Sequence, residues 1–152
     1  MIGILKASIG DLDQNFFMAK ALQQLQNTST QHCLFCDDIQ TAVIPKLHTN
    51  IFPRIQTFYF NDILITDDLT EAQGLSSISN AKRFMYLYHL EWPYIDNLRF
   101  QQIQPILLND NIELIARSNS HAKLISDLFK EPKYIMPEWD YKTLIEIDNN
   151  EQ

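Results

Sequence analysis

The sequence alternates short apolar runs with amphipathic stretches, and this alternation restricts the fold more than any other feature. Residues 62–68 contain a short continuous apolar run, as in a strand that is covered on both faces. Residues 119–130 form the clearest helix, with a predicted apolar stripe of Leu124, Ile125, Leu128 and Phe129. Strands that alternate with helices form βαβ units, which build a parallel sheet with helices on both faces. We therefore predict an α/β fold: a single Rossmann-like three-layer domain with a mainly parallel sheet.

The same patterns place the other elements. Strands are predicted at residues 1–8, 31–36, 54–60, 62–68, 82–90, 112–118 and 133–137. Helices are predicted at residues 13–26, 69–79, 93–104 and 119–130. Residues 44–55, which contain two prolines, are predicted as a loop or a loop with a short turn of helix, and residues 141–147 as a helical turn or a strand. The domain is expected to span residues 1–147, followed by a polar tail at 148–152.

Composition excludes several functional classes. The chain has 152 residues, the usual size of one domain, and its hydrophobic fraction of 45% is not that of a disordered protein. A net charge of −7 argues against direct binding to nucleic-acid phosphates, which requires a basic surface. No apolar run approaches the roughly 20 residues of a membrane span, and the N-terminus lacks a signal-peptide pattern. We therefore expect a cytoplasmic protein that does not enter a membrane.

The sequence predicts neither a metal site at its cysteine pair nor a glycine-rich nucleotide-binding loop. Cys33 and Cys36 form a C-x-x-C, but residues three apart in a strand face opposite sides, and zinc would require a second pair of ligands. We predict both cysteines to be small apolar strand residues. Gly10 is the one glycine after the first strand, which leaves no G-x-G-x-x-G, and no Walker A sequence occurs. Neither a metal nor a cofactor is predicted.

Polar side chains gather where the predicted strands end. In a parallel α/β sheet, ligands bind outside the carboxyl ends of the strands, so these side chains should converge on one rim. At the end of one strand, Glu91 could act as a base or accept hydroxyls, His89 could shuttle a proton, and Trp92 could stack on a sugar or base. In the alternative interpretation, Trp92 covers the core and the two charged groups face water.

Two further groups belong to the same predicted rim, together with Glu138. Asp67 and Asp68 together could bind a metal or act as acid and base, or they could cap the following helix. The helix start at Ser118, Asn119 and Ser120 offers free backbone N–H groups that suit a phosphate or carboxylate, and Arg117 beside it could add a charge-assisted bond. Ordinary helix capping by Ser118 or Asn119 is the alternative interpretation. No catalytic residue is assigned.

The order of these motifs resembles the N-terminal half of a GT-B glycosyltransferase. The segments that carry the resemblance are "ILITDD", "YLYHLEW", "IARS" and "YIMPEWD". The stretch "SIGDLDQNFFMAKAL" is similar to the first loop and helix of that family but lacks its usual adjacent glycines. In the family, a second Rossmann-like domain binds most of the nucleotide-sugar donor, and this sequence ends where that domain would begin.

The resemblance implies an acceptor-binding half that lacks the donor-binding domain, has a sugar acceptor, and works with a partner chain or by self-association. We expect such a chain to be inactive in isolation. The alternative is a non-catalytic protein-interaction or assembly module built on the same half-fold. The Asn-, Ile- and Gln-rich composition is compatible with a bacteriophage protein, which would place it in the host cytoplasm. The missing domain favours the second hypothesis, and the resemblance favours the first.

Overall fold

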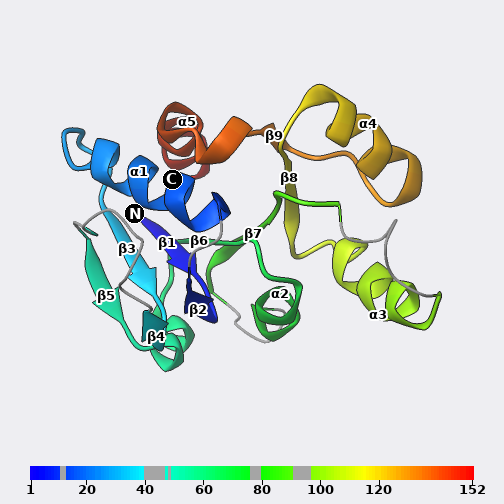
Figure 1. The fold of residues 1–152 in the computed structure, drawn as a ribbon, viewed down its shortest axis with the longest axis horizontal. Helices are drawn as coiled ribbons and strands as arrows, with labels where there is room; N and C mark the ends of the chain where they lie inside the picture. The colour runs from blue at the N-terminus through cyan, green and yellow to red at the C-terminus, as the bar shows by residue number, and fades with distance from the viewer. Residues whose placement is uncertain (11–12, 40–46, 48, 76–79, 91–96) are drawn as a thin grey trace.

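A seven-stranded parallel sheet forms the centre of the computed structural model, which describes residues 1–10, 13–39, 47, 49–75, 80–90 and 97–152 (Figure 1). The strands lie in the order β5-β3-β1-β6-β7-β8-β9. Their bounds are β1 Ile2–Leu5, β3 His32–Phe35, β5 Asn50–Phe52, β6 Ile63–Thr66, β7 Lys82–Leu87, β8 Glu113–Ala116 and β9 Tyr134–Ile135. A separate parallel pair joins β2 (Ser8–Ile9) to β4 (Asp38–Ile39). The predicted α/β, Rossmann-like fold is confirmed.

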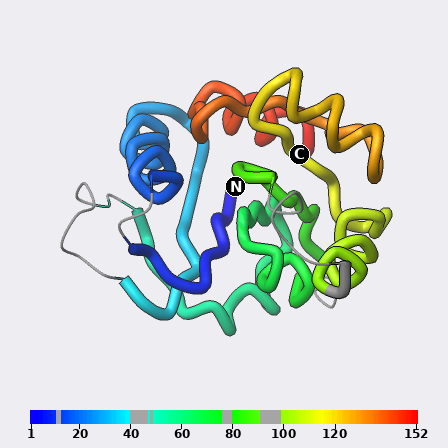
Figure 2. The backbone as a smooth tube through the Cα atoms, turned by 45° about the vertical axis from the view of Figure 1, so that its right-hand side comes forward, coloured from blue at the N-terminus to red at the C-terminus, as the bar shows by residue number. Residues whose placement is uncertain are grey.

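Helices cover both faces of the sheet. One layer contains α1 (Asp13–Leu25) and α5 (Tyr141–Glu151), which Figures 1 and 2 show together on one side. The other layer contains η1 (Arg54–Tyr59), α2 (Leu69–Leu75), α3 (Asn97–Leu107) and α4 (Asn119–Leu128). The core follows this division, since Ile63 and Ile65 of β6 pack with α1 and α5, whereas Leu64 packs towards α2. Such two-sided burial explains the continuous apolar run of this strand.

The cysteines confirm the expected alternation. Cys33 is buried in the cluster on the η1 and α2 side, and Cys36 is buried in the cluster on the α1 side. Burial raises the pKa of the Cys33 thiol to about 11 and also raises the pKa of Cys36. Both are therefore buried thiols on opposite faces, as predicted, although Cys36 lies one residue beyond the end of β3.

Two predictions around residue 53 are wrong. Residues 50–52, predicted as part of a loop, form the edge strand β5, and residues 54–59, predicted as a strand, form the 3-10 helix η1. Pro53, with φ −57°, stands between them and has no N–H to donate to a sheet. The Thr57 hydroxyl then donates to the Arg54 carbonyl oxygen at 2.8 Å, which stabilises the helical turn.

The C-terminal region also differs from the prediction. Residues 148–151, expected within a polar tail, continue α5, and the Asp148 side chain is buried. Asp140 caps this helix by accepting a hydrogen bond from the Thr143 N–H. Glu151 at its end accepts a hydrogen bond from the Tyr134 hydroxyl at 2.8 Å and pairs with Lys133 at 2.6 Å. Polar contacts with β9 therefore anchor the last turn.

Two helices depart from the predicted details. Helix α3 continues past Pro105 to Leu107, beyond the predicted end at residue 104. In α4 only Ile125 of the predicted stripe is buried, and Leu124 and Leu128 are exposed. Helix α4 covers the edge of the sheet near β8, where one row of side chains is enough to reach the core.

Candidate functional site

The ends of β7, β8 and β9 bring together Tyr88, Arg117 and Glu138. The Arg117 guanidinium donates from Nε to Glu138 Oε1 at 3.0 Å, and its NH2 group pairs with the same oxygen. The Tyr88 hydroxyl donates to Glu138 Oε2 at 2.5 Å. The Arg117 guanidinium carbon also lies 4.4 Å from the centre of the Tyr88 ring, in a cation–π arrangement. We call these three residues, with His89 and His121, the carboxyl-edge cluster.

A left-handed turn fixes the Glu138 carboxylate in this cluster. Glu138 and Trp139 have φ values of 47° and 55°, a region that bulky side chains rarely occupy. The fully buried Trp139 packs edge-on against Tyr86, with ring centres 5.0 Å apart. The Tyr86 hydroxyl donates to the Met136 carbonyl oxygen at 2.6 Å. Core packing therefore holds a strained turn that aims Glu138 at Arg117.

The cluster carries a fixed pair of charges near neutral pH. Burial raises the pKa of Glu138, but hydrogen bonds from Tyr88 and Arg117 outweigh it and hold that pKa below the ordinary value. The hydrogen bond to Glu138 raises the pKa of Arg117, although burial opposes it. Burial, followed by the hydrogen bond to Glu138, raises the pKa of Tyr88. Glu138 is therefore anionic, Arg117 cationic and Tyr88 neutral.

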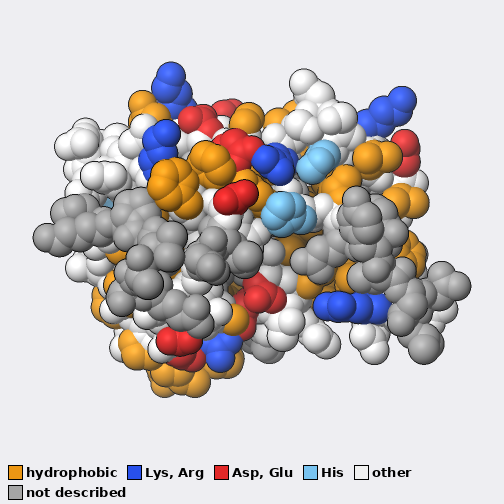
Figure 3. All heavy atoms as spheres, in the orientation of Figure 1, with side chains coloured by type: hydrophobic (Ala, Val, Ile, Leu, Met, Phe, Trp, Pro, Cys, Tyr) orange, Lys and Arg blue, Asp and Glu red, His pale blue; other side chains and the backbone are white. Residues whose placement is uncertain are grey.

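Two histidines flank the charged pair. His89 is exposed and packs edge-on against Tyr88 with ring centres 4.7 Å apart. His121 is half-buried, and its Nδ1 atom is buried without a hydrogen-bond partner. Burial, the Arg117 charge and His89 lower the pKa of His121. Figure 3 shows two histidine side chains next to a basic side chain near the centre of this face.

Ser118 has the capping role that the sequence allowed. Its hydroxyl oxygen accepts a hydrogen bond from the His121 backbone N–H at 3.2 Å at the start of α4. The hydroxyl groups of Ser118 and Ser120 also lie 2.9 Å apart. The Arg117 side chain next to this cap pairs with Glu138.

Asp67 and Asp68 have separate roles, at the point where the strand order reverses. The chain passes from β1 to β3 and β5 on one side and then returns to β6 on the other side. Lys6 follows β1 and Asp67 follows β6, and their Nζ and Oδ1 atoms are 2.5 Å apart. The side chains are 4% and 0% exposed. We call this ion pair the switch-point pair.

The switch-point pair is buried away from solvent. Burial raises the pKa of Asp67 above its ordinary value, although the Lys6 ammonium opposes the shift. Asp67 Oδ2 is buried without a hydrogen-bond partner. Asp68 instead caps α2, because its Oδ1 accepts the N–H groups of Thr70 at 2.7 Å and Glu71 at 3.3 Å. The two carboxylates therefore do not form a joint acid–base or metal site.

Sequence reasoning missed Lys6. The signal was a lysine at the end of an apolar run, directly after the first strand, as Asp67 directly follows a later one. Glu91 and Trp92, which were predicted to share a rim with His89, lie outside the described residues. The structure therefore brings His89, Arg117 and Glu138 together and places Asp67 with Lys6.

Within the described part of the chain, no group of three or more His, Cys, Asp or Glu side chains could hold a metal ion. Across the same residues, no helix combines the length and apolarity required to span a membrane. Comparisons with protein-family models, curated proteins and solved structures found no match.

Proposed function

We propose that the chain is the acceptor-binding half of a GT-B glycosyltransferase-like assembly. In this proposal, the carboxyl-edge cluster holds a polyhydroxylated acceptor for a donor-binding unit that lies outside these residues, carried by a partner chain. The observation that carries the proposal is the hydrogen-bonded pair of Arg117 and Glu138, whose side chains are 33% and 37% exposed. Sugar hydroxyls both donate and accept hydrogen bonds, so they suit a site that offers carboxylate, guanidinium and imidazole groups together.

The chemistry favours an acceptor over a nucleotide sugar. Arg117 is paired with Glu138 and Lys6 with Asp67, so a diphosphate would compete with a carboxylate for either cation. The net charge of −7 also disfavours a dianionic ligand. Holding donor and acceptor in register supplies roughly 7–11 kcal/mol of a transfer barrier. The chain alone is therefore expected to bind the acceptor without turning over a nucleotide sugar.

An NMR titration of the ¹⁵N-labelled chain with mono- and oligosaccharides tests this proposal. We expect chemical-shift changes at residues 86–90 and 117–121, and at least a roughly tenfold loss of affinity in His89→Ala with an unchanged far-UV CD spectrum. His32→Ala, which changes a histidine on β3, is the matched control and should retain binding. Failure of every sugar to shift these residues, or equal affinity in His89→Ala, would contradict the proposal.

A second candidate is a non-catalytic interaction or assembly module, of a kind that a bacteriophage could supply in its host's cytoplasm. It is favoured by large apolar side chains on β5 and η1 that are 36% to 82% exposed: Ile51, Phe52, Ile55, Phe58 and Tyr59. Contiguous exposed apolar surface often marks a protein interface. Pull-down from host lysate and light scattering of the purified chain test it. A partner or dimer that Tyr59→Ser abolishes, with no sugar binding, would favour this candidate over the first.

A further inference from the structure

A pocket of about 290 Å³ lies between η1 and α2, on the opposite face of the sheet from α1 and α5. Its apolar walls come from Leu5, Ile55, Phe58 and Leu75. Ile55 and Phe58 are 65% and 56% exposed, whereas Leu5 and Leu75 are buried beneath them. The pocket is near the lower size limit of small-molecule sites, roughly 300 Å³, and suits a compact apolar group.

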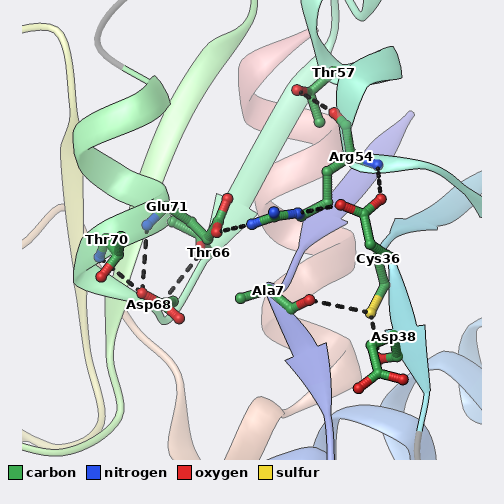
Figure 4. A network of polar contacts seen from close by, with 10 residues as sticks. Ala7, Cys36, Asp38, Arg54, Thr57, Thr66, Asp68, Thr70 and Glu71 are labelled. Atoms are coloured by element: carbon green, nitrogen blue, oxygen red, sulfur yellow. Dashed lines mark hydrogen bonds and ion pairs between the residues drawn. The ribbon is translucent and has the colours of Figure 1, made fainter.

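Three charged side chains form the polar end of this pocket. The Arg54 backbone N–H donates to Asp37 Oδ1 at 2.9 Å, and its Nε donates to Asp37 Oδ2 at 2.7 Å. The same guanidinium pairs with Glu71 on α2, and Figure 4 shows Arg54 reaching towards that residue. One guanidinium and two carboxylates leave a net charge of −1. The two carboxylates together have about eight lone-pair sites, so they can accept further hydrogen bonds beside Arg54.

Arg54 keeps the Asp37 carboxylate at the polar end of the pocket ionised. Hydrogen bonds from the Arg54 side chain and backbone hold the pKa of Asp37 below its ordinary value. Asp37 therefore remains anionic through the neutral range. Since the chain as a whole carries −7, the surrounding field also attracts a cation to this end of the pocket.

Gly74 leaves the α2 side of the pocket open. A glycine in a helix costs roughly 0.5–1 kcal/mol relative to alanine. A Cβ atom built at Gly74 would meet no heavy atom within 4 Å, so close packing does not require glycine at this position. Gly74 is one of the residues that line the pocket. A larger side chain here would therefore narrow the pocket without disturbing the core.

We propose that this pocket binds a small organic ammonium ion, a primary amine on a compact apolar body. The ammonium group donates hydrogen bonds to the carboxylates of Glu71 and Asp37, and the apolar body packs on Ile55, Phe58 and Leu75. The exposed Phe58 ring can add a cation–π contact. This site is separate from the carboxyl-edge cluster and does not depend on the proposed sugar acceptor.

An NMR titration with three probes of matched shape tests the proposal. Benzylamine is a cation at neutral pH, benzyl alcohol is neutral and benzoate is an anion. We expect benzylamine to shift the amide signals of residues 54–58 and 71–75 and to bind at least about tenfold more tightly than benzyl alcohol, because its hydrogen bonds are charge-assisted. Benzoate should cause no shift. Equal binding of benzyl alcohol, or preferred binding of benzoate, would overturn the proposal.

Two variants locate the site without breaking the core. Gly74→Met should abolish the benzylamine shifts while the midpoint of urea unfolding stays constant or rises, because methionine favours a helix. Gln73→Met on the same helix, outside this pocket, is the matched control and should bind normally. Glu71→Gln should weaken binding by at least about fivefold. If Gly74→Met and Glu71→Gln are both folded and bind benzylamine as the unchanged chain does, the pocket assignment is wrong.

Discussion

The switch-point pair and the carboxyl-edge cluster both lie at the carboxyl ends of the parallel strands, but they differ in how far they are buried. Lys6 and Asp67 are almost completely buried and neutralise each other, whereas Arg117 and Glu138 are about one-third exposed beside the exposed His89. Topology alone places a ligand where the strand order reverses. Here the charged groups at that point are already occupied by each other. At the ends of β7, β8 and β9, by contrast, the paired charged groups are partly exposed to water.

We infer that the switch-point pair stabilises the fold, whereas the ion pair of the carboxyl-edge cluster can take part in recognition. A buried ion pair requires both partners, because either ion alone would remain desolvated. A half-exposed pair can exchange part of its hydration for a ligand at small cost. The following predictions test whether the two regions differ in this way.

The largest effect is expected from Lys6→Met. Removing the ammonium leaves the buried Asp67 carboxylate without a counter-ion and should lower the free energy of unfolding by about 3–5 kcal/mol near pH 7. Burial already raises the pKa of Asp67, and loss of Lys6 raises it further. The folded state then binds more protons than the unfolded state, so the variant gains stability as pH falls towards the ordinary aspartate pKa. Urea unfolding at several pH values measures both effects.

The controls for this variant are a double substitution and a surface lysine. Lys6→Met with Asp67→Leu should regain most of the lost stability, because no buried charge remains. Lys20→Met, at an exposed position of α1, should change the free energy by less than about 0.5 kcal/mol. If Lys6→Met lowers the free energy of unfolding by less than about 1 kcal/mol, water reaches the switch-point pair. The two regions would then not differ in their exposure to solvent.

A loss of about 1 kcal/mol is expected from Ser118→Ala. The substitution removes the oxygen that accepts the His121 N–H at the start of α4. Ser118→Asp keeps an acceptor at the cap and should remain close to the stability of the unchanged chain. Denaturant unfolding compares the variants. No loss in Ser118→Ala would mean that another residue, such as Asn119, caps the helix.

A smaller loss, below about 1 kcal/mol, is expected from Glu138→Gln because this pair is partly screened by water. The pKa of Glu138 is held below its ordinary value, so its stabilisation is present above the unfolded-state pKa of about 4.3. That stabilisation disappears as pH falls through the folded-state pKa. Thermal unfolding measured from acid to neutral pH should therefore give midpoints that converge at low pH for the unchanged chain and Glu138→Gln. A constant difference at all pH values would exclude this charge effect.

The smallest effect is expected from His121→Gln. The pKa of His121 lies below its ordinary value because of burial, the Arg117 charge and His89. The unfolded chain binds the proton more readily, so stability rises with pH up to the ordinary histidine pKa of about 6.5. His121→Gln should remove this slope. NMR titration of the ring should also show a higher pKa for His121 in His89→Ala, and an unchanged pKa would exclude coupling between the two histidines.

The elements that could be predicted from sequence are those whose own residues meet the core. The buried parts of strands β6, β7 and β8 are mostly apolar because helices cover both faces of these strands, and the polar run at residues 118–120 marks the start of α4. The edge strand β5 was missed because it has only three residues, all exposed, and stands directly before Pro53. The last turn of α5 was read as a tail because its polar residues are satisfied by distant partners such as Tyr134.

The sequence by itself determined the α/β class, the parallel sheet and the carboxyl edge on which the polar residues gather, since these follow from local periodicity and chain connectivity. Only the tertiary structure decided which charges pair. Lys6 and Asp67 are separated by 61 residues and meet because β1 and β6 are neighbours in the sheet. Arg117 meets Glu138 because buried Trp139 supports a left-handed turn. Ion pairing depends on distance and dehydration, and both quantities exist only after the chain has folded.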